Sequence, residues 1–345
     1  MPAKANTPAA DPAALARLYD LADQYHAMAP WQELYETDLV AVRHPRTGET
    51  AYLSVMGRDG THCALAAYLG ADALSRFNLI QETNSKGTPF GLEDSVALIL
   101  ESRQLQVAFA TRAELAKPQL DAIKRLGRKY RGDNWPKFDS YQPGYAPNPL
   151  DAGEIEWLTI ALEQFLKLVS RGDPSLAVLH RRTSHAKIPC REQVEGAWRD
   201  GWIEMDATRF CFPTPPADPA LVARVAAHPR ATRIDCSFAL VPAPTGPYGK
   251  RIFPYLLISA DAASGMVLGC DLLSVEAQTH AEMIASAPAQ FLRQWDRARL
   301  RPAAIRVTTH TTGAILAAAA RALGVPLTFH NRLPSLEAIK QHLPF

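Results

Sequence analysis

The stretch between Arg125 and Tyr145 carries the residue types best suited to binding chemistry. Cationic and aromatic side chains are interleaved along it, and the candidate nucleic-acid-binding residues are Arg125, Arg128, Lys129, Arg131 and Trp135. Cations neutralise phosphates and aromatic faces stack on bases, so such a run can hold a single strand. The alternative is a proline-stiffened loop whose rings pack on the domain while its charges face water. We favour this packing interpretation and keep nucleic acid as a candidate partner.

Histidines are the other candidates for metal binding or acid–base chemistry. A second basic cluster consists of His180, Arg181, Arg182, His185 and Lys187, and two further histidines, His310 and His330, end neighbouring predicted strands. Imidazole can bind a metal or transfer a proton, but His180 and His185 have no evident third ligand nearby. His310 and His330 could face each other at the strand ends. We favour solvated histidines in both places and predict no metal site.

Signatures of several enzyme classes are missing from the sequence. It contains no GxGxxG, no Walker loop, no GxSxG and no HExxH. Rossmann redox chemistry, P-loop nucleotide hydrolysis and serine hydrolysis therefore lack their motifs, and we predict no cofactor.

Residues 230–345 are predicted to run strand, strand, strand, helix, strand, helix, strand, helix. The first strand, Arg233–Val241, alternates with period two and places Ile234, Cys236 and Phe238 on one face. The later strands are expected at 251–260, 266–273, 304–308 and 326–330, and the helices at 277–297, 312–323 and 334–342. Gly324 should cap the second of these helices.

This order resembles the ribonuclease H-like core of integrases and transposases. The resemblance is carried by Ile234-Asp235, by the hairpin around Asp261 and Ser264-Gly265, and by Ile305-Arg306-Val307. It implies one mixed sheet with helices on its faces, in which the first and fourth strands are adjacent and parallel.

The same resemblance implies a carboxylate cluster that clamps two divalent metals around a phosphate. Asp235 matches the acid of the first strand, and Glu337 is the candidate on a later helix. The fourth strand ends in Thr308-Thr309-His310, and a hydroxyl cannot replace a carboxylate as a charged bridging ligand. For a nuclease, the missing acid would have to come from elsewhere, such as Asp261 or Asp271. We favour a local pairing role for Asp235 and no catalytic residues.

The sequence pattern before residue 230 predicts an antiparallel meander of strands together with helices. Strands are expected at 39–43, 50–56, 61–69 and 105–110, helices at 11–28, 70–81, 118–126 and from 151 to about 169, and a loop at 83–91. The domains are then a disordered tail at 1–14, an α+β domain at 15–172, a linking module at 173–229 and the ribonuclease H-like domain at 230–345. The fold class is α+β with an α/β-like C-terminal part.

Composition indicates a soluble globular protein. The chain has 345 residues, of which 47% are hydrophobic and 21% charged, and a net charge of +2 is too small to indicate nucleic acid or membrane by itself. Its 5 cysteines form no CxxC pair, which is typical of reduced thiols in a cytoplasm. The N-terminus lacks the apolar segment of a signal peptide, and no membrane partner is expected.

Most of the chain is similar to a bacterial family of uncharacterised proteins, known as domains of unknown function. The matching stretches include Leu53-Ser-Val-Met-Gly57, Tyr130-Arg-Gly132 with Trp135-Pro136, and Phe253-Pro-Tyr255. This resemblance implies no activity.

We therefore predict a non-catalytic cytoplasmic binding or scaffold protein with a degenerate ribonuclease H-like domain. A cluster of three carboxylates within metal-bridging distance would instead favour a metal-dependent nuclease or transposase-related enzyme. A closed apolar pocket between the domains would favour a small-molecule sensor.

Overall fold

The structure, a computed structural model, describes residues 11–86, 92–170, 187–204, 209–230 and 232–340. The chain divides into two compact units. Unit 1 comprises Met1–Gln81, Ser102–Gln142 and Pro147–Arg209, and unit 2 comprises Glu82–Glu101, Pro143–Ala146 and Phe210–Phe345. The described ranges contain nine α-helices and two mixed sheets, so the α+β class is confirmed. Within these ranges, no helix is long and apolar enough to cross a membrane.

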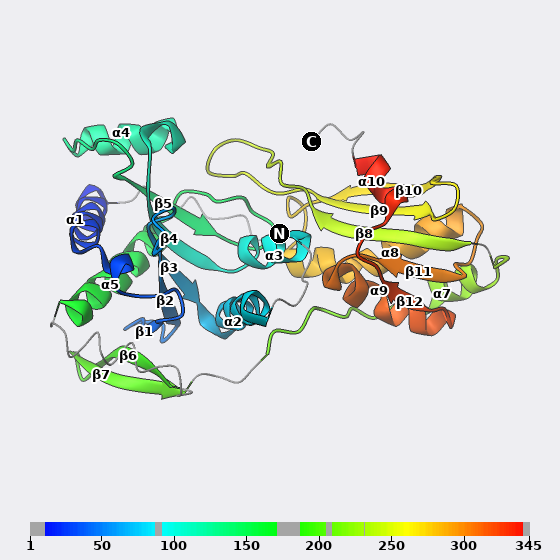
Figure 1. Cartoon of the computed structure of the whole chain (residues 1–345), viewed down its shortest axis with the longest axis horizontal. Coiled ribbons are helices and arrows are strands. Elements are labelled where there is room, and N and C mark those ends of the chain that lie inside the picture. The colour runs from blue at the N-terminus through cyan, green and yellow to red at the C-terminus, as the bar shows by residue number, and fades with distance from the viewer. Residues whose placement is uncertain (1–10, 87–91, 171–186, 205–208, 231, 341–345) are drawn as a thin grey trace. The chain divides into compact units, whose positions relative to one another are not determined.

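Unit 1 is built on a seven-stranded sheet with the order β5-β4-β3-β2-β1-β6-β7 (Figure 1). Its strands are β1 Val40–Arg43, β2 Thr50–Met56, β3 Ala64–Leu69, β4 Gln104–Ala110, β5 Trp135–Tyr141, β6 Lys187–Val194 and β7 Ala197–Glu204. Every neighbouring pair is antiparallel except β1 and β6, which are parallel.

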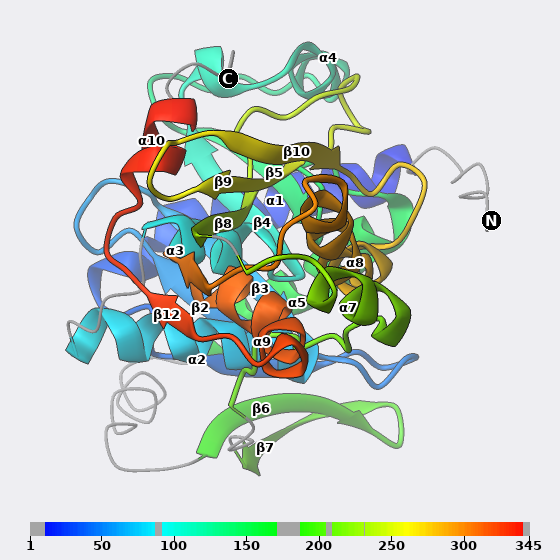
Figure 2. The same cartoon turned by 90° about the vertical axis from the view of Figure 1, so that its right-hand side faces the viewer.

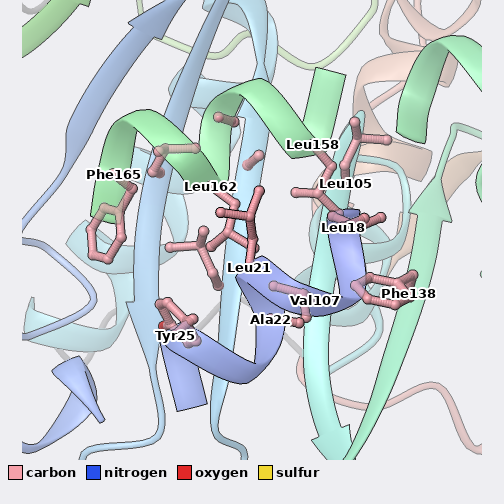
Figure 3. Close-up of a cluster of buried hydrophobic side chains, with 14 of the residues drawn as sticks. Leu18, Leu21, Ala22, Tyr25, Leu105, Val107, Phe138, Leu158, Leu162 and Phe165 are labelled. Carbon is pink, nitrogen blue, oxygen red and sulfur yellow. The ribbon is translucent and has the colours of Figure 1, made fainter. Parts of the chain in front are cut away.

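Helices cover both faces of this sheet. On one face, α1 (Pro12–Met28) and α5 (Ala152–Val169) enclose the main core, in which Leu18, Val107 and Leu162 meet (Figure 3). The other face packs against α2 (Gly70–Lys86) through a smaller apolar cluster. Unit 1 also contains α4 (Lys117–Arg125) and two short 3-10 helices, η1 (Pro30–Gln32) and η2 (Arg112–Glu114). The Asp151 side chain begins α5 as its N-cap, as its capping-box sequence predicts.

Several boundaries in unit 1 differ from the prediction. The predicted meander and the predicted strand at 105–110 are present as β1–β4, but β5 extends the sheet, and α2 continues to Lys86, into the stretch predicted as a loop. Trp135–Tyr141 forms the strand β5 rather than a loop. The predicted linking module at 173–229 supplies β6 and β7 to the sheet of unit 1. A local pattern cannot reveal the pairing of β6 with β1, because these strands are distant in the sequence.

Unit 2 is built on a five-stranded sheet with the order β10-β9-β8-β11-β12. The strands are β8 Arg233–Leu240, β9 Tyr255–Asp261, β10 Val267–Leu273, β11 Ala304–Val307 and β12 Leu327–Phe329. The pairs β8–β9 and β9–β10 are antiparallel, whereas β8–β11 and β11–β12 are parallel. The predicted adjacent and parallel pairing of the first and fourth strands is thus present.

The helices of unit 2 lie on both sides of its sheet (Figure 2). One face packs against α7 (Pro219–Ala226), α8 (His280–Arg297) and α9 (His310–Leu323), and the other against α10 (Pro334–Lys340). Gly324 caps α9 in the left-handed conformation, as predicted. Pro288 was expected to kink or break the helix before it, but α8 continues through this residue. A further helix, α3 (Leu92–Leu100), belongs to this unit and was not predicted.

Candidate functional site

Asp235, the acid expected on the first strand of unit 2, is fully buried and already paired. The sheet register places it beside Arg306 of β11. Arg306 donates from Nε to Oδ1 at 2.6 Å and from Nη2 to Oδ2 at 2.8 Å, and the Ser335 hydroxyl also donates to Oδ2. The hydrogen bond to Asp235 raises the pKa of Arg306. Both carboxylate oxygens therefore serve a bidentate ion pair within the sheet.

Two of the other acids named for a nuclease centre are engaged locally. Asp261 lies at the turn after β9, where its Oδ1 accepts hydrogen bonds from the Ser264 and Ala263 backbone N–H groups at 2.7 and 2.9 Å. The backbone hydrogen bond from Ser264 is the main cause that lowers the pKa of Asp261. Glu337 forms an ion pair with Arg332 at 2.7 Å on an exposed surface.

Asp271 lies on the opposite face of the sheet from Asp235. Its Oδ2 accepts a 2.8 Å hydrogen bond from Gln294 of α8, whereas Asp235 bonds to Ser335 of α10. The sheet itself therefore separates these two carboxylates, and they cannot bridge one metal ion. Among the described residues, no group of three His, Cys, Asp or Glu side chains is arranged to hold a metal.

The residues that follow β11 include no acid, but Asp94 of α3 places a carboxylate beside them. Asp94 accepts hydrogen bonds from the backbone N–H groups of His310 and Thr311 at 2.6 and 3.3 Å and from the Thr311 hydroxyl at 2.9 Å. His310 Nδ1 lies 3.2 Å from the same carboxylate. Asp94 is buried, and it sits at the positive end of the α9 dipole. It thus caps α9 together with Thr309, the N-cap residue.

The other end of α3 is held by a second buried polar group. The Tyr255 hydroxyl donates to Glu101 Oε1 at 2.8 Å, and His280 Nε2 lies 3.2 Å from that hydroxyl and 3.5 Å from the carboxylate. Tyr255 begins β9 and His280 begins α8. Polar contacts therefore fix α3 to three elements of unit 2.

A sequence signal for α3 exists. Glu93 and Asp94 stand in its first turn, where acids favour a helix N-terminus, and Leu98 follows Asp94 at a spacing of four. Asp94 and Leu98 are both buried. The preceding polar stretch hides the signal, because it is typical of a loop.

The histidines at the ends of β11 and β12 have different surroundings. The His310 ring stacks on Phe212 with a centroid distance of 5.8 Å and is tilted against Phe329 at 5.2 Å. His330 Nε2 instead lies 3.0 Å from the Thr328 hydroxyl.

Four residues of the second basic cluster, His180, Arg181, Arg182 and His185, lie outside the described residues. Lys187 of that cluster pairs with Glu204 across β6 and β7.

The basic and aromatic run of unit 1 is divided between packing and exposure. Arg128 forms ion pairs with Asp20 and, at 2.7 Å, with Asp23 of α1, and donates to the Ala16 carbonyl at 3.0 Å. In contrast, Arg125, Lys129 and Arg131 are exposed. Arg128 therefore serves the docking of its own segment on α1.

The aromatic members of the run are turned toward the domain. Tyr130 stacks on Tyr19 of α1 at 6.5 Å and contacts Trp135 at 5.8 Å. Trp135 is half-buried and packs against the main core of unit 1, and Phe138 lies inside that core. This arrangement agrees with the packing interpretation of these rings.

Comparisons with known proteins assign both parts of the chain. Residues 16–187 match the family model of a domain of unknown function, DUF7309, and residues 221–344 match that of a second one, DUF6930. No curated protein and no solved structure matches the chain. The chain therefore belongs to two families of domains of unknown function, DUF7309 in residues 16–187 and DUF6930 in residues 221–344.

Proposed function

We propose that this is a non-catalytic binding or scaffold protein in which unit 2 is a degenerate ribonuclease H-like domain. The sheet of unit 2 supports the fold. Its first three strands form an antiparallel meander, and its fourth and fifth strands lie parallel to the first, on the side away from the second. Fold alone does not imply an activity, so the function is argued from the residues of the site.

The pairing of Asp235 with Arg306 is the observation that carries the proposal. A two-metal centre needs carboxylate oxygens that face the cations and enough negative charge to offset their repulsion. Here a guanidinium occupies both oxygens of Asp235. At about 4 Å and an effective dielectric constant of about 20, two unit charges interact by about 4 kcal/mol, and a dication beside Arg306 would be repelled by about twice that.

Asp94 does not restore the missing acid of the fourth strand. Its two oxygens accept hydrogen bonds from the start of α9 and are buried there. Releasing them for a metal would uncap α9 and leave backbone N–H groups without partners, which is costly in a buried place.

A nuclease assay tests this proposal. We expect the purified protein to cleave neither DNA nor RNA, single- or double-stranded, with Mg²⁺ or Mn²⁺ present. Cleavage that disappears in Asp235→Asn, in a variant whose circular dichroism and unfolding midpoint show an intact fold, would contradict the proposal and establish the metal-dependent nuclease alternative. Cleavage that persists in Asp235→Asn would point to a contaminating nuclease.

Nucleic acid is the partner class that the surface of unit 1 supports. Exposed Arg125, Lys129 and Arg131 lie close together in sequence after α4 and leave their charges available. The packed rings of Tyr130 and Trp135 offer little stacking surface. Binding at this place would therefore be electrostatic and weak in sequence preference.

A cytoplasmic location is part of the proposal. Cys63, Cys190, Cys211, Cys236 and Cys270 all lie within the described residues, and none forms a disulfide. Unpaired thiols are the usual state of cysteines in a reducing compartment. Burial raises the pKa of Cys236 well above its usual value, so that thiol stays protonated.

A further inference from the structure

Unit 1 contains a polar pocket of about 260 Å³ for which the proposed function has no use. Its floor is the part of the sheet formed by β4 and β5. One wall is the connection between β2 and β3, and further walls come from η2 and from the turn before β5. The pocket lies entirely among described residues of unit 1.

The strand register explains why the floor is polar. Gln106 lies opposite Asp139 in the register of β4 and β5, and two residues along, on the same face, Ala108 lies opposite Lys137. Side chains alternate along a strand, so Val107 between them points into the apolar core on the other face. The small side chain of Ala108 leaves room above the floor, between the larger polar residues.

A chain of hydrogen bonds fixes the polar groups of the pocket. The Tyr141 hydroxyl donates to Gln106 Oε1 at 3.0 Å, and Gln106 Nε2 lies 3.1 Å from His62 Nε2. In this arrangement His62 Nε2 accepts, so a neutral imidazole carries its proton on Nδ1. Lys137 Nζ lies 2.9 Å from Asp139 Oδ2, and Asp139 is buried. The side chains of the floor are thus oriented before any ligand arrives.

The wall formed by the β2–β3 connection is held by a close backbone approach and by local hydrogen bonds. Gly57 has a φ of +110°, and a Cβ there would lie 2.6 Å from Cys63 Cα, so the two ends of the connection touch. Within it, Gly60 N–H donates to the Gly57 carbonyl at 2.9 Å, and Thr61 N–H donates to Asp59 Oδ1 at 3.1 Å. His62 follows directly and is therefore presented to the pocket by a well-determined turn.

The lining carries an excess of negative charge. The carboxylates of Glu114, Asp133 and Asp139 and the ammonium group of Lys137 line the pocket. Lys137 pairs with Asp139, and Glu114 Oε2 accepts hydrogen bonds from the Thr111 backbone N–H at 2.8 Å and hydroxyl at 2.7 Å, which are neutral donors. The lining therefore keeps two more negative than positive side chains from Asp, Glu, Lys and Arg. Burial raises the pKa of the nearby Cys63 thiol, and the charges of Asp133 and Asp59 raise it further. Both observations indicate a negative potential inside the pocket.

We propose that this pocket binds a small organic cation, one that carries an amine or guanidinium group together with a hydroxyl or amide group. The carboxylates of Asp133 and Glu114 at its rim attract the positive charge. The preset amide of Gln106 and imidazole of His62 supply hydrogen bonds to polar groups of the ligand. The pocket volume is at the lower end for ligand sites, which restricts the ligand to a small metabolite.

Isothermal titration calorimetry on the full chain tests the inference. The probes are ethanolamine, glycinamide and 2-guanidinoethanol, each of which joins a cation to a hydroxyl or amide group, with glycerol and inorganic phosphate as neutral and anionic comparisons. We expect at least one of the three cations to bind and neither comparison compound to do so. Asp133→Asn should weaken that binding about fivefold, as for a partly exposed ion pair. Asp121→Asn removes an exposed acid on α4 outside the pocket and should leave the affinity unchanged.

Ala108→Leu provides a test that alters no charge. The larger side chain fills the floor and should abolish cation binding. Asp133→Asn, at an exposed position, decides the matter if Ala108→Leu fails to fold. The inference is wrong if none of the three cations binds at millimolar concentration, if phosphate binds more tightly than they do, or if Asp133→Asn binds as the unaltered protein does.

Discussion

Asp94 and Thr311 are separated by 217 positions in the chain, yet the Thr311 hydroxyl donates a 2.9 Å hydrogen bond to Asp94 Oδ1. Asp94 thereby completes the N-terminus of α9 from another helix, α3. A backbone N–H at a helix start needs an acceptor, and a buried one from a distant segment ties that segment to the domain. The helix α3 is consequently an integral part of unit 2.

We expect Asp94→Ala to destabilise unit 2 by about 1 to 3 kcal/mol, because buried N–H groups of α9 lose their charged acceptor. Urea unfolding, followed by circular dichroism, measures the free energy of unfolding. Asp94→Asn should have a smaller effect, since its amide oxygen can still accept. Glu276→Gln changes an exposed acid of the same unit and serves as the control. Equal stabilities of Asp94→Ala and the control would show that the cap contributes nothing.

Arg306→Leu should be among the most destabilising substitutions in the chain. It leaves the fully buried Asp235 carboxylate without its counter-charge, which typically costs about 3 to 5 kcal/mol. The double variant Asp235→Leu/Arg306→Leu should recover part of this loss, because no isolated charge remains in the sheet.

A double-mutant cycle by chemical denaturation measures the coupling of this pair. Arg293→Leu, at an exposed position of α8, is the matched control and should have little effect. A double variant that is less stable than Arg306→Leu alone would contradict the buried ion-pair interpretation.

The pKa of Asp261 predicts a specific pH dependence of stability. Hydrogen bonds, first that from the Ser264 backbone, lower this pKa in the folded protein. A lowered carboxyl pKa stabilises the fold above the unfolded value of about 3.9, and this contribution is lost as pH falls through the folded pKa. In Asp261→Asn the free energy of unfolding should therefore fall less steeply below about pH 4. Urea unfolding at a series of acidic pH values checks this, and a slope identical to that of the unaltered protein would refute it.

Binding of single-stranded nucleic acid, if electrostatic, should weaken steeply with salt. Three phosphate contacts, one each from Arg125, Lys129 and Arg131, predict a slope of about −2 in a plot of log affinity against log salt. Replacing all three by alanine should remove binding in a fluorescence anisotropy titration. Lys117→Ala, at the other end of α4, is the control. No detectable binding by the unaltered protein at low salt would eliminate nucleic acid as a partner of this surface.

Trp135→Ala separates stacking from packing. Because Trp135 packs against the main core of unit 1, its loss should lower the free energy of unfolding by about 2 kcal/mol. It should change nucleic-acid affinity less than Arg131→Ala does. The opposite order of effects on affinity would show that the indole stacks on bases.

The sequence alone determined those elements whose cause is local. The alternation of Ile234, Cys236 and Phe238 specifies β8, since side chains in a strand repeat every two residues, and all three are buried on one face. Gly324 ends α9 because the cap requires a positive φ, which glycine adopts without strain. The order of the elements in residues 230–345 follows from many such signals.

Tertiary structure alone decided the partners of the charged residues. Asp235 is an acid on a strand in the sequence, and only the register of β8 against β11 places Arg306 beside it. The carboxylate of Asp94 reaches the end of β11 from a helix more than 200 positions earlier. The pocket of unit 1 likewise depends on the pairing of Gln106 with Asp139. Contacts between distant segments depend on the whole fold, because their free energy is gained only after the chain between them has closed.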